Sequence, residues 1–229
     1  MAMWLVPKLV CAGMIALSVS FPAPAPAPDR TILAEVKENQ THATLVAATK
    51  PVDGTYSGMT VLLNDQKKTF PWKNISEPAF YPEIVLSNVD GIGSDETIII
   101  LTTGKGTGIR TSEVHVLKED WNEVPVRDAV AEARNLLSSV RKESVTSVEY
   151  TLDINGKKYG YSFPIEDAEL WFEQAVVGHI LRYRVQDNKL IAEIPVQVSP
   201  GIFTGSIEVE YKEKQGTLVP FQVSYVEDR

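Results

Sequence analysis

The sequence predicts an α+β fold that is mainly antiparallel β-sheet and contains one long amphipathic helix. Three observations lead to this prediction. Short β-branched or alternating segments recur from residue 52 onward, separated by turn signals such as Asn155-Gly156. Residues 127–143 change to helical spacing. The C-terminal segments then follow one another closely, as expected for a β-meander in which sequence neighbours pair antiparallel.

The N-terminus has the pattern of an export signal followed by a spacer. Residues 9–20 (LVCAGMIALSVS) are an uncharged run of 12 residues after Lys8, which is within the length of a signal-peptide core. The run is shorter than the ~20 residues of a membrane-spanning helix. Alternating alanine and proline at 21–28 favours extended polyproline II. We therefore expect a signal peptide at 1–20, a Pro/Ala-rich spacer and polar tail at 21–51, and no transmembrane span.

Charge and cysteine content narrow the function classes. The chain carries 22 basic and 30 acidic side chains, a net charge of −8, which argues against binding to nucleic acid phosphates. Its single cysteine, Cys11, lies inside the expected signal peptide, so the mature chain has no thiol. The residues before Cys11 (KLV) do not resemble a lipoprotein cleavage site. An exported chain without disulfides is typical of a Gram-positive bacterium, secreted or associated with the cell envelope.

Residues 52–126 are predicted to form a first β region. The run TIIILT at 97–102 is β-branched almost throughout, which is typical of a strand buried on both faces. Residues 109–117 alternate in polarity, as a half-buried strand does. The other expected strands of this region are 55–63 and 67–72, joined by a turn at Asn64-Asp65, and 81–87.

A connecting helix is predicted at 127–145. Apolar residues recur there at helical spacing with charges between them: Ala129, Ala133, Leu136, Leu137 and Val140. The remainder, 146–229, is predicted as a C-terminal antiparallel β region. Its expected elements are strands at 147–154, 157–163, 179–186, 189–198, 203–211 and 217–226, with a short helix at 166–175.

Residues 88–96 (NVDGIGSDE), between two of these strands, carry the pattern of a cation-binding loop. Asn88, Asp90 and Glu96 stand at alternate or ligand-like positions, and Ser94 offers a further oxygen. Carboxylate and carbonyl oxygens at such spacing converge on Ca²⁺ when glycines, here Gly91 and Gly93, permit a tight turn. A plain polar hairpin turn is the alternative interpretation of the same residues.

The segment 81–100 resembles a single degenerate unit of the FG-GAP/VCBS (integrin-alpha-like) repeats, whose calcium loops have the form D-x-D-G-D-G-x-x-D/E. The layout is also similar to that of secreted proteins from spore-forming Gram-positive bacteria. The resemblance implies a blade-like N-terminal sheet and a weak Ca²⁺ site at Asn88, Asp90, Ser94 and Glu96. Ile92 departs from the pattern, because an aspartate is normal there, and its side chain could pack inward in place of the ion.

The patterns that would indicate catalysis are weaker than the pattern of the cation-binding loop. The histidines His42, His115 and His179 lack zinc-motif spacing, and the sequence has no G-x-S-x-G elbow. The glycine-rich run 102–108 precedes an expected strand, not the helix that a phosphate loop requires. Two carboxylate pairs, Glu166/Asp167 and Glu208/Glu210, could serve glycoside hydrolysis, or the second pair could lie on a solvated strand face. The aromatic residues Trp72, Trp121, Tyr159, Tyr161, Trp171 and Phe172 could form a sugar-stacking platform or belong to the core.

From these observations we expect a secreted, monomeric, non-catalytic binding module. Its partner would be an extracellular or cell-wall ligand, and its one expected cofactor is weakly bound Ca²⁺. The alternative is an extracellular hydrolase that uses carboxylates. A hydrolase would gather two or more acids with raised pKa in a cleft, whereas a binding module would disperse them.

Overall fold

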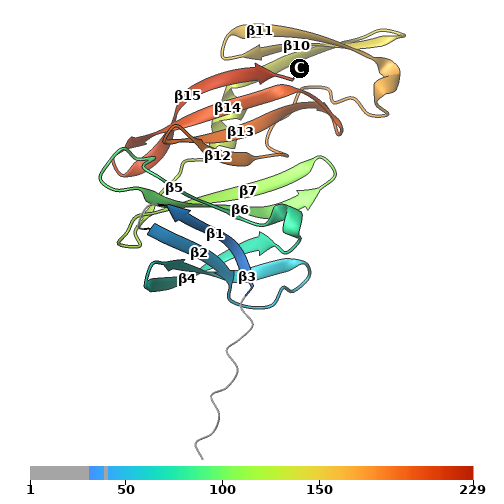
Figure 1. Ribbon diagram of the computed structural model, residues 1–229. Helices are drawn as coiled ribbons and strands as arrows, with labels where there is room; N and C mark the ends of the chain where they lie inside the picture. Colours follow the sequence, from blue (N-terminus) through green and yellow to red (C-terminus); the bar gives the residue numbers. More distant parts are fainter. Residues whose placement is uncertain (1–30, 39–40, 229) are drawn as a thin grey trace, which may run out of the picture.

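The computed structural model describes residues 31–38 and 41–228 (Figure 1). The expected signal peptide, with Cys11, and the alanine–proline run lie outside the described residues. Of the described residues, 65% are in strands and 7% are helical, so the fold is mainly β and not strictly α+β. None of the described helices is long and apolar enough to cross a membrane.

The strands form four antiparallel sheets, each built from strands that are close in sequence. Sheet A contains β1 (Ile32–Glu38), β2 (Thr41–Ala47), β3 (Thr55–Leu63) and β4 (Gln66–Ile75). Sheet B contains β5 (Glu83–Ser87), β6 (Glu96–Gly106), β7 (Ile109–Leu117) and β8 (Glu123–Val124). Sheet C contains β12 (Arg182–Gln186), β13 (Lys189–Ser199), β14 (Ile202–Lys214) and β15 (Thr217–Glu227). Sheet D contains β9 (Leu137–Glu143), β10 (Ser147–Ile154) and β11 (Lys157–Pro164). The helical elements are η1 (Pro78–Phe80), α1 (Ala129–Leu136) and η2 (Ile165–Asp167).

The sheets stack in the order A, B, C, D, as Figure 1 shows from bottom to top. Two apolar clusters hold the stack together. One fills the space between sheets A and B, and the other joins sheet B to sheets C and D. Ile99 and Leu101 of β6 enter the first cluster, and Ile98 and Ile100 enter the second. The prediction that 97–102 is a strand buried on both faces is therefore confirmed, and the two β regions share one core.

Buried polar groups link neighbouring sheets. The Asn74 side chain, fully buried at the end of β4, accepts a hydrogen bond from the Thr102 amide of β6 at 2.7 Å and donates one to the Phe80 carbonyl at 2.8 Å. The Tyr150 hydroxyl of β10 donates to the Phe172 carbonyl and lies 3.2 Å from the Val198 carbonyl of β13. Each of these hydrogen bonds satisfies a buried backbone group. They therefore fix the position of one sheet relative to the next, in addition to the apolar contacts.

The long helix predicted at 127–145 is wrong. Helix α1 ends at Leu136, and the chain continues as strand β9, which pairs with β10 along its whole length. Ala129 and Ala133 are buried as the helical spacing predicts, but Val140 is exposed on the outer face of sheet D. The Ser139 hydroxyl accepts a hydrogen bond from the Ala175 amide at 2.8 Å. Pairing with a neighbouring strand thus overrides a local helical pattern that contains poor helix formers.

The described part of the expected spacer and tail at 21–51 also differs from the prediction, because β1 and β2 form one side of sheet A. Their inward residues Leu33, Ala43 and Leu45 are small or aliphatic and are buried against sheet B. The expected short helix at 166–175 is reduced to the single turn η2. By contrast, the predicted hairpin turns are confirmed, since Asn64 and Asn155 both adopt the left-handed backbone conformation that such turns require.

Candidate functional site

The predicted cation loop, residues 88–96, connects β5 to β6 at one end of sheet B. The structure brings Asn88, Asp90 and Glu96 together but leaves Ser94 exposed. Glu96 begins the central strand β6 and is 1% exposed. Its Oε2 accepts hydrogen bonds from the Val89 amide at 2.9 Å and the Asp90 amide at 3.3 Å. Glu96, at the start of β6, therefore holds the backbone of the loop at Val89 and Asp90.

Asp90 is held by two donors. Its Oδ1 accepts a hydrogen bond from the Ile92 amide at 2.7 Å, which closes a tight turn. Its Oδ2 lies 2.7 Å from the ammonium of Lys118, which reaches over from the β7–β8 turn. The Asp90 side chain is only 1% exposed, whereas that of Lys118 is 40% exposed. The ion pair is thus buried on the carboxylate side and open to solvent on the ammonium side.

The two carboxylates have opposite pKa shifts. Burial raises the pKa of Glu96, and the neighbouring Asp90 carboxylate raises it further, against the hydrogen bonds from the loop amides. Burial acts in the same direction on Asp90, but the hydrogen bonds from the Lys118 ammonium and the Ile92 amide outweigh it, so the pKa of Asp90 lies below its usual value. The pKa of Lys118 is raised by its hydrogen bond to Asp90. The loop therefore favours an ionised Asp90 beside a charged Lys118.

The remaining residues of the loop do not complete a metal site. Asn88 donates to the Gly93 carbonyl at 3.0 Å, and its Oδ1 is buried without a partner among the described residues. Ile92 is 56% exposed, so the expectation that it packs inward is wrong. Ser94 lines a different hollow from Asn88 and Asp90. No group of three or more His, Cys, Asp or Glu side chains suited to a metal occurs in 31–38 and 41–228.

The oxygen atoms of this loop suit an ammonium group better than Ca²⁺. One free oxygen, Asn88 Oδ1, is available to a cation, but Glu96 is engaged with backbone amides and Asp90 with Lys118. A calcium ion needs six to eight oxygen ligands and here would have to displace the lysine. Calcium binding at Asn88, Asp90, Ser94 and Glu96 stays a prediction, and no step below depends on it.

A hollow of about 650 Å³ lies between this loop and one end of sheet C. Its loop side is formed by 88–91. The sheet side comes from the β12–β13 turn and from β14 and β15, with the lining residues Asp187, Asn188, Lys189, Glu210, Tyr211, Lys212, Glu213 and Phe221. The two sides are tied together because the Ser87 hydroxyl donates a hydrogen bond to Asn188 Oδ1 at 2.8 Å. We call this hollow the loop–sheet hollow.

Phe221 is the exposed apolar side chain of the loop–sheet hollow, with 61% of its surface accessible, whereas Val89 is buried. The register explains its exposure: Glu210 of β14 pairs with Gln222 and Tyr211 pairs with Pro220, so Phe221 is passed over at a bulge. A bulge redirects the extra side chain and is common beside functional sites. The Lys212 ammonium lies 4.9 Å from the centre of the Phe221 ring. The sequence predicted neither Phe221 nor Lys118 as a site residue, because the first depends on the register of β14 and β15 and the second on a contact between two loops.

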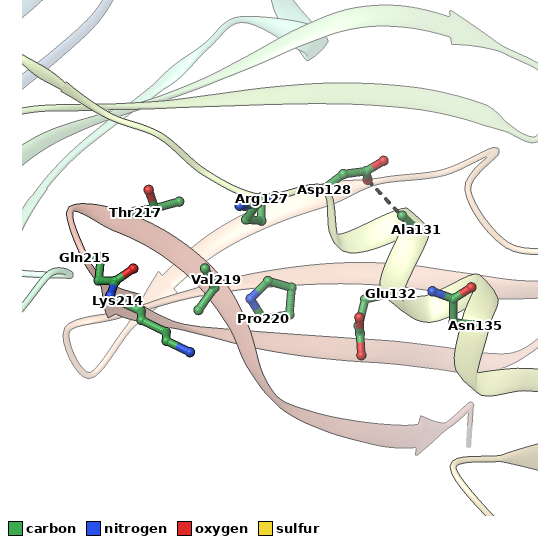
Figure 2. Close-up of a pocket in the computed structure, with 10 residues that line it drawn as sticks. All are labelled: Arg127, Asp128, Ala131, Glu132, Asn135, Lys214, Gln215, Thr217, Val219 and Pro220. Carbon is green, nitrogen blue, oxygen red and sulfur yellow. Dashed lines mark hydrogen bonds between the residues drawn. The ribbon is translucent and has the colours of Figure 1, made fainter.

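A second hollow, about 570 Å³, lies between α1 and the β14–β15 turn (Figure 2). Two of its polar groups have structural roles. Asp128 caps α1 by accepting hydrogen bonds from the amides of Val130 at 2.8 Å and Ala131 at 3.4 Å, the latter drawn in Figure 2. The Arg127 carbonyl accepts a hydrogen bond from the Tyr211 hydroxyl at 2.7 Å. This hollow therefore follows from the joint between α1 and sheet C.

The other candidates from the sequence are accounted for by local contacts. Glu208 and Glu210 lie half-buried on one face of sheet C, ion-paired with Arg184 at 2.8 Å and Lys189 at 2.9 Å. The run 102–108 is the end of the β6–β7 hairpin, so a strand follows it, as expected.

His115 is held between carboxylates, with Nδ1 2.6 Å from Glu123 and Nε2 3.8 Å from Glu113. Its ring stacks on Trp72 at 4.0 Å, and Trp72 in turn stacks on Phe70 at 4.0 Å. Trp72 and Trp171 are both core residues, and Tyr159 packs edge-on against Tyr225 between sheets C and D. The six aromatic residues considered from the sequence therefore do not form one platform.

Comparison with protein-family models, with curated proteins and with solved structures finds no match to this chain.

Proposed function

We propose that the protein is a secreted, cell-envelope-associated binding module whose ligand site is the loop–sheet hollow. The observation that carries the proposal is the bulge that exposes the Phe221 ring at a hollow lined mostly by polar side chains. The volume of about 650 Å³ is within the range of small-ligand sites. An apolar ring next to amides and carboxylates suits a ligand that has both an apolar face and hydroxyl groups.

Charge argues against an anionic ligand, because four acidic and two basic side chains line the hollow. Three of these six are already compensated, since Lys189 is paired with Glu210 at 2.9 Å and Asp90 with Lys118 at 2.7 Å. Asn88 and Asn188 contribute amide groups, which donate and accept hydrogen bonds without a charge. A saccharide of the cell wall matches this combination of an aromatic face and amide groups. Secretion, predicted from residues 1–20, would place the module beside such polymers.

The carboxylate hydrolase remains the second candidate, and one observation favours it. Asp90 and Glu96 are neighbouring carboxylates whose pKa values are shifted in opposite directions, as in an acid and base pair. Both side chains are buried, however, and bond to the backbone of their own loop. Their arrangement stabilises the loop, and for this reason we place binding first.

The test is binding of the mature chain to purified cell-wall saccharide, measured by co-sedimentation and by calorimetry with soluble fragments. Phe221→Ala should weaken binding at least about tenfold, because a truncated aromatic anchor commonly costs more than ~1.4 kcal/mol. Leu170→Ala is the matched control, since Leu170 is 58% exposed but does not line the hollow. Equal affinity of Phe221→Ala and the native chain would refute the site. Release of reducing ends by the native chain, abolished in Glu96→Gln, would establish the hydrolase instead.

A further inference from the structure

The buried Asp90 carboxylate of the 88–96 loop requires a cation. Asp90 and Glu96 are 7% and 1% exposed as whole residues, and an uncompensated charge at such depth is strongly unfavourable. Glu96 is satisfied by the amides of Val89 and Asp90. Asp90 Oδ2 faces the Lys118 ammonium at 2.7 Å. The cation in this loop is therefore a side chain of the protein itself.

The backbone around Lys118 positions this ammonium. Lys118 follows directly after β7, and its amide donates to the Asn122 carbonyl at 2.9 Å while its carbonyl accepts from the Trp121 amide at 2.9 Å. Trp121 adopts a left-handed conformation, with φ of 67°, that closes this turn. The Trp121 indole also donates to Gln66 Oε1 at 2.9 Å, which fastens the turn to sheet A. Lys118 thus reaches the loop from a fixed base.

We propose that Lys118 is the resident cation of the 88–96 loop, so that the loop folds around an ammonium group and does not need a divalent metal. The site is a cation site already filled by the chain. Removing the lysine leaves the Asp90 carboxylate beside Glu96 without an opposite charge. Ca²⁺ is the probe for a cation that partly replaces the lost ammonium, because it prefers carboxylate oxygens.

The proposal goes beyond the proposed function and is independent of it, because it concerns how the loop is stabilised and not which ligand the hollow binds. It predicts that the shape of this wall of the loop–sheet hollow is the same with and without calcium. The measurements below therefore use the mature chain without saccharide.

The experiment compares melting temperatures in EDTA and in millimolar CaCl₂ for the native chain and for Lys118→Met. We expect the native melting temperature to be the same in both. Lys118→Met should melt at least about 5 °C lower in EDTA, because it leaves a buried carboxylate unpaired. Calcium should restore part of this loss, since a ligand that binds the folded state raises its stability. Lys189→Met is the matched control, as its ion pair with Glu210 lies at the same hollow but is more exposed; it should show no calcium response.

Two results would overturn the proposal: a calcium-dependent rise in melting temperature of the native chain, or a Lys118→Met variant as stable as the native chain in EDTA. If Lys118→Met does not fold in EDTA, the double variant Lys118→Met/Asp90→Asn distinguishes the loss of a cation from the loss of packing. It removes the carboxylate together with the ammonium, so it should fold and should melt without a calcium response. A double variant that is also unfolded in EDTA would show that Lys118 acts through packing and not as a cation.

Discussion

The Tyr150 hydroxyl links sheet D to sheet C, and its removal tests whether the two sheets unfold as one cooperative unit. Tyr150 is 1% exposed in β10, and its hydroxyl donates to the Phe172 carbonyl and lies 3.2 Å from the Val198 carbonyl of β13. The Val198 carbonyl also accepts a hydrogen bond from the Phe172 amide at 2.9 Å. In Tyr150→Phe, Val198 therefore keeps a donor, whereas the Phe172 carbonyl loses the one that Tyr150 provides.

The expected loss follows from this difference. Removing a hydrogen bond and leaving one partly buried acceptor without its partner should lower the free energy of unfolding by about 1–2 kcal/mol. In a chain of this size each kcal/mol corresponds to about 2–4 °C, so the melting temperature should fall by about 2–8 °C. The ring remains, and with it the contact to Trp171 at 6.3 Å between ring centres.

The assay is guanidinium unfolding followed by tryptophan fluorescence and by circular dichroism. The two probes should report one transition with an unchanged denaturant dependence, since Trp171 lies in the cluster of sheets C and D and Trp72 in that between sheets A and B. Tyr159→Phe is the control, because the Tyr159 hydroxyl makes no hydrogen bond within the described part of the chain. The reasoning is refuted if Tyr150→Phe changes stability by less than about 0.5 kcal/mol, or if the control loses as much.

Three further predictions concern the core and the sheet edges. Gly205→Ala should lower the free energy of unfolding by about 1–3 kcal/mol, because the new Cβ would lie 2.3 Å from the Val226 carbonyl, whereas Gly160→Ala has open space and should be nearly neutral in the same denaturant titration. Asn74→Ala should cost about 1–3 kcal/mol by leaving the buried Thr102 amide unpaired, measurable by thermal melting and by faster exchange of that amide. Burial raises the pKa of the Tyr211 hydroxyl in the folded state. The stabilisation from the protonated hydroxyl is therefore complete below pH ~10, and the free energy of unfolding falls by about 1.4 kcal/mol per pH unit above it. Tyr211→Phe should therefore show a shallower loss of stability in alkaline melts, and an unchanged slope would contradict the assignment.

Much of the β architecture follows from local sequence. Positions Asn64 and Asn155 required a left-handed backbone, and this fixed two hairpin registers. The β-branched run at 97–102 could only be satisfied by burial on both faces, which the central position of β6 provides. The loop at 88–96 was recognisable because carboxylates and glycines at close spacing restrict the backbone by themselves.

Contacts between distant segments decided the rest. The sequence by itself determined where the chain turns, which strand is central and where the acidic loop lies. The tertiary structure decided that 137–143 is a strand, because its backbone groups are satisfied by β10 and not by a helix. It also decided that Lys118 meets Asp90 and that a bulge exposes Phe221. Neither relation has a local signal, since an ion pair between two loops of sheet B and a register shift in sheet C depend on which segments meet after folding.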